Sequence, residues 1–184
     1  MKDYRRYLAR QQERVITDYT DAVVDRYSRT TIVRVDLYYR SEAQARLRVE
    51  HVFDDLDKLM VERESNSIFD HETGYICSVE QGQDRGYHIH AAFFFNGNEV
   101  RGDIHKAQLI GELWERITRG YGCFNSCNHD KDRYEGRLGI GMIRRDDLRA
   151  RQHVHEAMRY LVKDEQPLLV KPLRAKCLRK GQVC

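Results

Sequence analysis

Two strand-like segments joined by a short, glycine-containing loop constrain the fold more than any other feature. Residues 75–80 (YICSVE) and 87–95 (YHIHAAFFF) are rich in β-branched and aromatic residues, which favour strands. The six residues between them, QGQDRG, contain Gly82 and Gly86, which suit a hairpin turn. We therefore predict two adjacent antiparallel strands in the middle of the chain.

The hydrophobic pattern around this hairpin alternates between helical and strand periods. A spacing of three to four residues predicts a long N-terminal helix over 3–27 and another over 41–65, and a period of two predicts a strand over 31–40. The later predicted elements are a helix over 103–120, a strand over 137–145 and a last helix capped by Asp146 or Asp147. Strands separated by helices indicate an α+β fold, with a central antiparallel sheet and flanking helices.

Basic and acidic residues balance over the whole chain but not along it. The 32 Lys and Arg residues and the 29 Asp and Glu residues leave a net charge of +3, which excludes a histone-like polycation. Residues 1–136 hold 20 basic and 24 acidic side chains, whereas residues 137–184 hold 12 basic and 5 acidic ones, a net charge of +7. We expect nucleic acid to bind the face formed by this C-terminal quarter.

The sequence shows neither a membrane anchor nor a secretion signal. The longest apolar runs, such as 91–95, fall far short of the roughly 20 residues that span a bilayer, and the N-terminus lacks a hydrophobic signal core. Five cysteines are an odd number, which favours reduced thiols over a disulfide framework. We expect a cytoplasmic protein without a membrane partner.

The sequence His88-Ile89-His90 is a candidate metal site because it lies in a predicted strand. Residues two apart on a strand point to the same face, so both imidazoles can meet one cation. The preceding strand ends near Glu80, and the hairpin would bring that carboxylate close to His88. Two imidazoles and a carboxylate leave positions open on Mg²⁺, Mn²⁺ or another divalent ion. The alternative is a histidine pair that only makes structural hydrogen bonds.

A second His-x-His sequence, at residues 153–155, lies in the predicted last helix. Side chains two apart on a helix diverge by roughly 200°, so this pair should not bind one ion. His153 shares a helical stripe with Glu156, Tyr160 and Lys163. The stripe places a tyrosine on a polar face of the helix.

The order and spacing of these residues resemble the HUH endonucleases of the rolling-circle replication initiator class. In that class a strand carries His-hydrophobic-His and a later helix carries Tyr-x-x-Lys, as residues 88–90 and 160–163 do here. The segments GYHIHAAFFF, GELW and RYLVKDEQPL are also similar to the inovirus replication protein and YagK/YfjJ C-terminal domain group. The resemblance implies an HUH/ferredoxin-like sandwich with a helical extension at 1–30, a nuclease domain at 31–166 and a basic tail at 167–184.

The resemblance further implies a site-specific nickase in which Tyr160 attacks a phosphate of single-stranded DNA. A cation held by Glu80, His88 and His90 would polarise that phosphate. The product would be a 5′-phosphotyrosine and a free 3′-OH, and attack by a 3′-OH would rejoin the strands. Only about one tyrosine in a thousand is ionised at neutral pH, so the nucleophile needs such help. Lys163 could hold a phosphate or assist Tyr160, or be a solvated lysine at the helix end.

Two further groups of polar residues allow two interpretations each. Asp36, on the polar face of the first predicted strand, could orient a metal-binding histidine or only pair with Arg34. Cys123, Cys127 and His129 have a loose zinc-like spacing without an evident fourth ligand, which favours thiols in a loop over a zinc site.

Positive charge near the predicted nucleophile suits a DNA backbone. Arg144, Arg145, Arg149 and Arg159 lie in the strand and helix that lead to Tyr160, and we predict that they bind DNA phosphates. The resemblance implies a replication initiator of a phage or prophage element in a bacterial host, acting on single-stranded or supercoiled origin DNA. The sequence has no GxxxxGK[ST] phosphate loop, so unwinding would need a host helicase or supercoiling. The alternatives are a relaxase, a single-tyrosine transposase and a non-catalytic nucleic-acid-binding module.

Overall fold

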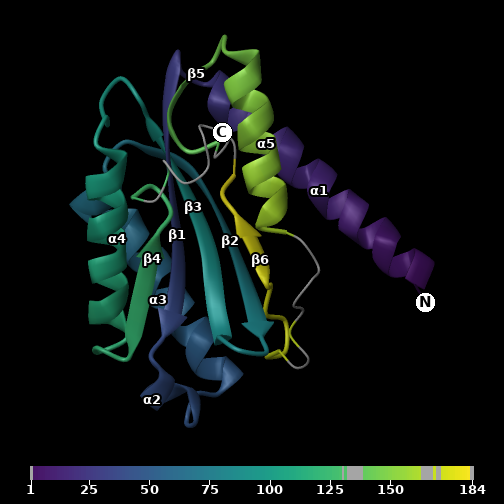
Figure 1. The fold of residues 1–184 in the computed structure, drawn as a ribbon, viewed down its shortest axis with the longest axis vertical. Coiled ribbons are helices and arrows are strands. Elements are labelled where there is room, and N and C mark those ends of the chain that lie inside the picture. Colours follow the sequence, from purple (N-terminus) through teal and green to yellow (C-terminus); the bar gives the residue numbers. More distant parts are fainter. Residues whose placement is uncertain (1, 130, 132–138, 163–167, 169–170, 183–184) are drawn as a thin grey trace.

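The computed structural model of the protein describes residues 2–129, 131, 139–162, 168 and 171–182, which form a six-stranded antiparallel sheet between two layers of helices (Figure 1). The strands are β1 (Arg29–Tyr39), β2 (Glu72–Gly82), β3 (Gly86–Asn96), β4 (Gly122–Ser126), β5 (Gly141–Arg144) and β6 (Leu178–Lys180). The helices are α1 (Lys2–Asp25), α2 (Ser41–Gln44), α3 (Val49–Ser65), α4 (Asp103–Ile117) and α5 (Leu148–Tyr160), with a 3-10 turn η1 (Ser67–Phe69). The predicted α+β architecture and its long N-terminal helix are confirmed.

The predicted hairpin is the centre of the sheet. Strands β2 and β3 pair over their whole length, up to the close opposition of Gly82 and Gly86, and β1 pairs with the other edge of β3. The strand order is β4-β1-β3-β2-β6, and β5 pairs with β1 next to β4. Strand β4 covers the Val35–Tyr39 end of β1, whereas β5 covers the Arg29–Ile32 end.

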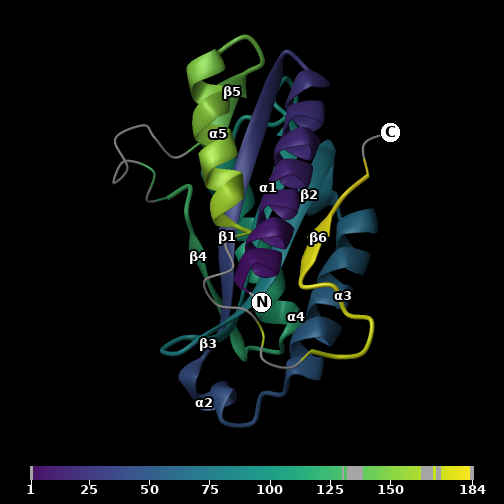
Figure 2. The same ribbon diagram turned by 90° about the vertical axis from the view of Figure 1, so that its right-hand side faces the viewer.

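Alternation along β1 sends side chains to two cores on opposite faces of the sheet. Val33, Val35 and Leu37 are fully buried against α3 and α4. Ile32 faces the other way and packs with residues of α1 and α5, which lie side by side on that face (Figure 2). The period-two pattern of β1 thus directs alternate side chains toward the two helical layers.

The helices α1 and α5 cover only part of their face of the sheet. The apolar cluster beneath them includes Ile32, Ile76, Ala92 and Phe94. Further along the same face β1 continues with the polar residues Arg34, Asp36 and Tyr38, beside His90 and His88 of β3. Helix α5 ends at Tyr160 next to this polar region. The candidate site therefore lies where the apolar cover stops.

Several elements differ from the prediction in their limits. The helix predicted over 41–65 is wrong as a continuous element, because Arg48 is extended and separates α2 from α3. The Arg48 backbone N–H donates to His51 Nδ1 at 3.2 Å, which caps the start of α3. The short edge strand β6, which pairs with β2, was not predicted from the sequence. Asp147 caps α5, as predicted, by accepting from the Ala150 N–H.

Among the described helices, none combines the length and the apolar composition that crossing a bilayer requires. The domain limits predicted at 30/31 and 166/167 stay predictions, and the second falls among residues outside the described part of the chain.

The contact between α4 and β4 generates a test of the packing. Gly111 faces the ring of Phe124, so a methyl group added there would overlap that ring. Replacing glycine by alanine inside a helix normally stabilises by about 1 kcal/mol, but overpacking costs about 1 to 3 kcal/mol. We predict that Gly111→Ala lowers the free energy of unfolding by about 1 kcal/mol or more in urea denaturation.

The matched control is the same substitution in a Phe124→Ala background. With the ring removed, Gly111→Ala should raise the free energy of unfolding relative to Phe124→Ala alone, because only the gain in helix propensity remains. Stabilisation by Gly111→Ala in the otherwise wild-type protein would contradict the packing described here.

Candidate metal centre and nucleophile

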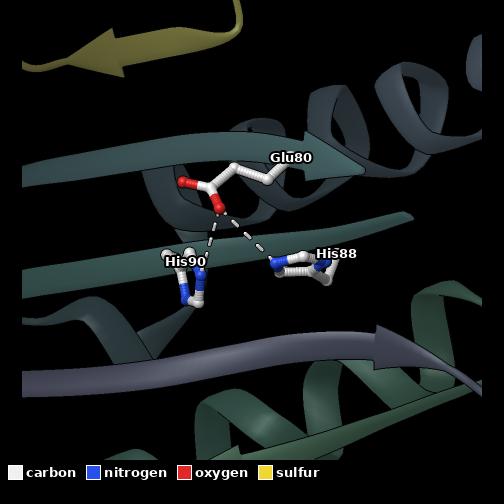
Figure 3. Close-up of side chains that lie close together, drawn as sticks. All are labelled: Glu80, His88 and His90. Atoms are coloured by element: carbon white, nitrogen blue, oxygen red, sulfur yellow. Dashed lines mark ion pairs between the residues drawn. The ribbon is translucent and has the colours of Figure 1, made fainter. Parts of the chain in front are cut away.

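Glu80, His88 and His90 meet on the polar part of the sheet face, where both histidines are buried and Glu80 is partly buried. The β2–β3 register places Glu80 opposite His88 and Ser78 opposite His90. Glu80 Oε2 lies 3.6 Å from His88 Nε2 and 3.6 Å from His90 Nε2, and Figure 3 shows both imidazoles turned toward this carboxylate. In the part of the chain that the structure describes, these residues form the only group of three or more potential ligands arranged to hold a metal ion.

Both imidazoles are held in the orientation that a metal ligand needs. His88 Nδ1 lies 3.0 Å from the Gly86 carbonyl oxygen, and His90 Nδ1 lies 2.6 Å from Asp36 Oδ1. These acceptors favour a proton on each Nδ1, so each Nε2, which faces Glu80, is the nitrogen available to a metal ion. Two ligands of one cation, each about 2.1 Å from it, lie about 3 to 3.6 Å apart. The donor set therefore fits a divalent ion, and Glu80, His88 and His90 could hold it.

The acidic side chains and the His90 imidazole shift the pKa values of one another. Burial opposes ionisation of Glu80, but His88 and His90 outweigh it and lower the pKa of the carboxyl. Burial likewise disfavours a charged His90, yet Asp36 and Glu80 raise its pKa to about 9. Without a metal His90 is therefore protonated on both ring nitrogens at neutral pH, and a cation binding to Nε2 would displace the proton there.

Asp36 links His90 to the rest of the candidate site. Besides His90, its carboxylate accepts from the Tyr38 hydroxyl at 3.4 Å and from Cys127 Sγ at 3.6 Å. Burial opposes ionisation, but His90 and Arg34 lower the pKa of Asp36 overall. Both interpretations of the sequence thus have a structural counterpart, since Asp36 orients His90 and also lies 3.7 Å from Arg34.

Tyr160, at the C-terminal end of α5, lies beside the candidate metal site. Val154, Ala157 and Met158 anchor the helix to the apolar part of the sheet face. The Tyr160 ring packs edge-on to His90, with ring centroids 6.0 Å apart, and the residue as a whole is 45% exposed. The structure thus brings Tyr160 together with Glu80, His88, His90 and Asp36. Lys163 lies outside the described residues.

The predicted DNA-binding arginines are spread over the molecule. Arg144 opposes Arg29 at the far end of β1, seven residues or about 23 Å from Asp36, and donates two hydrogen bonds to Asp146. Arg145 donates to the backbone carbonyl of Asp25 at the end of α1. Arg149 lies in the first turn of α5, about 16 Å from Tyr160. Arg159, exposed and next to Tyr160 in sequence, is the one of the four near the site.

The other predicted patterns do not gather ligands in the described residues. His155 Nε2 lies 2.9 Å from Asp21 of α1, whereas His153 lines a pocket beside Gly139. The two imidazoles of this second His-x-His sequence therefore have different surroundings. Cys77, Cys123, Cys127 and Cys177 form no disulfide among the described residues.

Arg34 and Tyr38 also belong to the site, although neither was among the site residues predicted from the sequence. The Arg34 guanidinium carbon lies 4.9 Å from the centroid of the Tyr160 ring, and the Tyr38 ring stacks on His88 with centroids 5.7 Å apart. Both residues share the face of Asp36, because they are two positions away on the same strand. That alternation was a usable signal, but the cross-strand register that aligns them with β3 was not readable from the sequence.

One protein family matches this chain over nearly its whole length. The YagK/YfjJ C-terminal domain matches residues 3–163, which run from the second residue of α1 to beyond the end of α5. The chain belongs to the YagK/YfjJ C-terminal domain family. No curated protein and no solved structure matched it.

The orienting contact of Asp36 gives a prediction for this family member. Asp36→Asn keeps the shape of the side chain but removes the charge that holds His90, so we predict that Mn²⁺ affinity falls about 10- to 100-fold in titration calorimetry. Asp55→Asn is the matched control. Asp55 also accepts from a tyrosine hydroxyl, that of Tyr39, and lies on α3 on the opposite side of the sheet. Equal losses in both variants, or none in Asp36→Asn, would contradict an orienting role.

Proposed function

We propose that this protein is a site-specific, metal-dependent single-stranded DNA endonuclease of the HUH class, which nicks and rejoins DNA to initiate rolling-circle replication of a phage or prophage element. One observation carries the proposal. Tyr160 lies at the end of a separate helix with its ring against His90, one of the three residues that could hold a metal ion. Family membership is compatible with this proposal, and the resemblance of residues 88–90 and 160–163 to HUH motifs adds to it.

The residues divide the chemistry between them. When bound at Glu80, His88 and His90, a divalent cation supplies Lewis-acid polarisation of the scissile phosphate. The Tyr160 oxygen attacks phosphorus, a bond between that oxygen and phosphorus forms, and the bond from phosphorus to the 3′ oxygen breaks. The phenolic proton is lost to solvent or a base, and the departing 3′ oxygen takes up a proton. A later attack by a 3′-OH reverses these steps and rejoins the strand.

The exposed position of Tyr160 suits a strand that arrives from solvent. The residue is 45% exposed, and the sheet face beside it carries the polar residues Asp36, His88 and His90 rather than an apolar core. A single strand is narrow and flexible enough to reach an exposed tyrosine beside these buried polar groups.

Covalent capture of DNA tests the proposed nucleophile. Single-stranded oligonucleotides with a randomised centre and a 3′ fluorophore, mixed with the protein and Mn²⁺, should give a labelled adduct that resists denaturing gel electrophoresis. Tyr160→Phe keeps the ring but removes the attacking oxygen, so we predict that adduct formation falls by more than about 10³-fold. Tyr121→Phe removes a hydroxyl from an exposed tyrosine elsewhere and should leave the adduct unchanged.

Three outcomes of this experiment would count against parts of the proposal. An undiminished adduct in Tyr160→Phe would exclude this tyrosine as the nucleophile. Oligonucleotide binding that survives EDTA, without any adduct in Mn²⁺ or Mg²⁺, would favour a non-catalytic nucleic-acid-binding module. Captured sequences dominated by hairpins rather than by origin-like repeats would favour a relaxase or a single-tyrosine transposase.

A further inference from the structure

Arg34 is a largely buried arginine beside the candidate site, and one of its hydrogen-bond donors has no partner among the described residues. Its side chain is 11% exposed, and its Nε is buried without a hydrogen-bond partner among the described residues. A guanidinium stays protonated at any physiological pH, so Arg34 cannot relieve this state by losing its charge. Buried donors are normally paired, and one left open at a site suggests that a ligand supplies the acceptor.

Asp36 does not satisfy this guanidinium. The closest approach recorded between them, from Nη2 of Arg34 to Oδ1 of Asp36, is 3.7 Å and exceeds a hydrogen bond. The carboxylate oxygens of Asp36 already accept from His90, Tyr38 and Cys127. The Asp36 carboxylate therefore interacts mainly with its other neighbours, and the Arg34 guanidinium can bind an anion other than Asp36.

The position of Arg34 determines which anion it can reach. The Tyr160 ring contacts both Arg34, 4.9 Å from its centroid, and His90, 6.0 Å away between ring centroids. A group held between the Tyr160 hydroxyl and the metal-binding cluster therefore lies near the guanidinium. Planar guanidinium groups bind phosphate oxygens with two parallel hydrogen bonds, a geometry that a lysine cannot offer.

We infer that Arg34 binds a non-bridging oxygen of the DNA phosphodiester that is presented to Tyr160. The inference deepens the proposed function and rests on it for the identity of the ligand. Arg34 thereby supplies a fixed positive charge to the phosphate, from the side of the Tyr160 ring.

Arg63 provides a natural comparison within the same chain. Its Nε is also buried and without a partner among the described residues, and its guanidinium also lies over a tyrosine ring, 4.4 Å from the centroid of Tyr75. Unlike Arg34, it donates to both carboxylate oxygens of Glu72 at 3.2 Å. Arg63 already has its anion, and Tyr75 packs with the core on the opposite face of the sheet. Arg63→Gln is therefore the matched control.

Binding without cleavage separates this inference from the proposed reaction. Fluorescein-labelled dT20 is titrated with the protein in EDTA, and anisotropy is followed over a series of NaCl concentrations. We expect Arg34→Gln to weaken binding about tenfold at low salt and to reduce the slope of log K against log [salt] by about 0.7, the loss of one phosphate contact. Arg63→Gln should match the wild-type protein. Unchanged affinity and slope in a folded Arg34→Gln variant would overturn the inference.

A measurement on the wild-type protein covers the case in which Arg34→Gln fails to fold. The Nε–Hε resonance of Arg34, assigned in ¹⁵N-labelled protein through its own backbone, should shift when dT20 is added, while that of Arg63 should not. A stationary Arg34 resonance at saturating dT20, or no binding of dT20 at all, would overturn the inference. Binding with the expected shift but without any Tyr160 adduct in Mn²⁺ would instead reject the proposed reaction and leave Arg34 as a phosphate contact.

Discussion

The cross-strand register of β1, β3 and β2 is the constraint on which the site depends. Because side chains alternate along a strand, one register places Asp36 opposite His90, Tyr38 opposite His88 and Glu80 opposite His88 on a single face. A slip of one strand by one residue would turn the polar side chains of that strand into the core formed with α3 and α4. The buried residues between them, Val35, Leu37 and Ile89, hold the register because their burial requires it.

The second requirement is that a helix from elsewhere in the chain ends at the correct place on that face. Helix α5 packs on α1 and on the apolar part of the sheet, and it ends at Tyr160 where the polar residues begin. Arg151 strengthens this packing through ion pairs with Asp21 and Asp25 of α1. The basic residues of the C-terminal quarter are thus divided, since Arg151 serves the packing of α5 while Arg159 stays exposed beside Tyr160.

Much of the fold was predictable because it follows from local patterns. The hairpin, the strand context of His88 and His90, and the Asp147 cap depend on residues close together in the sequence. The break between α2 and α3 was missed because it is set by the extended conformation of Arg48 rather than by a proline or glycine. Strand β6 has only three residues, too few to show a period. The contacts of Arg34 and Arg144 depend on long-range pairing, so their different surroundings could not be predicted from charge alone.

The central claim is that this sheet face holds a divalent ion next to Tyr160. Anomalous scattering from crystals grown with Mn²⁺ tests it most directly, because it locates the ion without reference to any activity. The account predicts a peak about 2.1 to 2.3 Å from His88 Nε2, His90 Nε2 and a carboxylate oxygen of Glu80. A crystal with Mn²⁺ bound at another cluster and none among these three residues would contradict it.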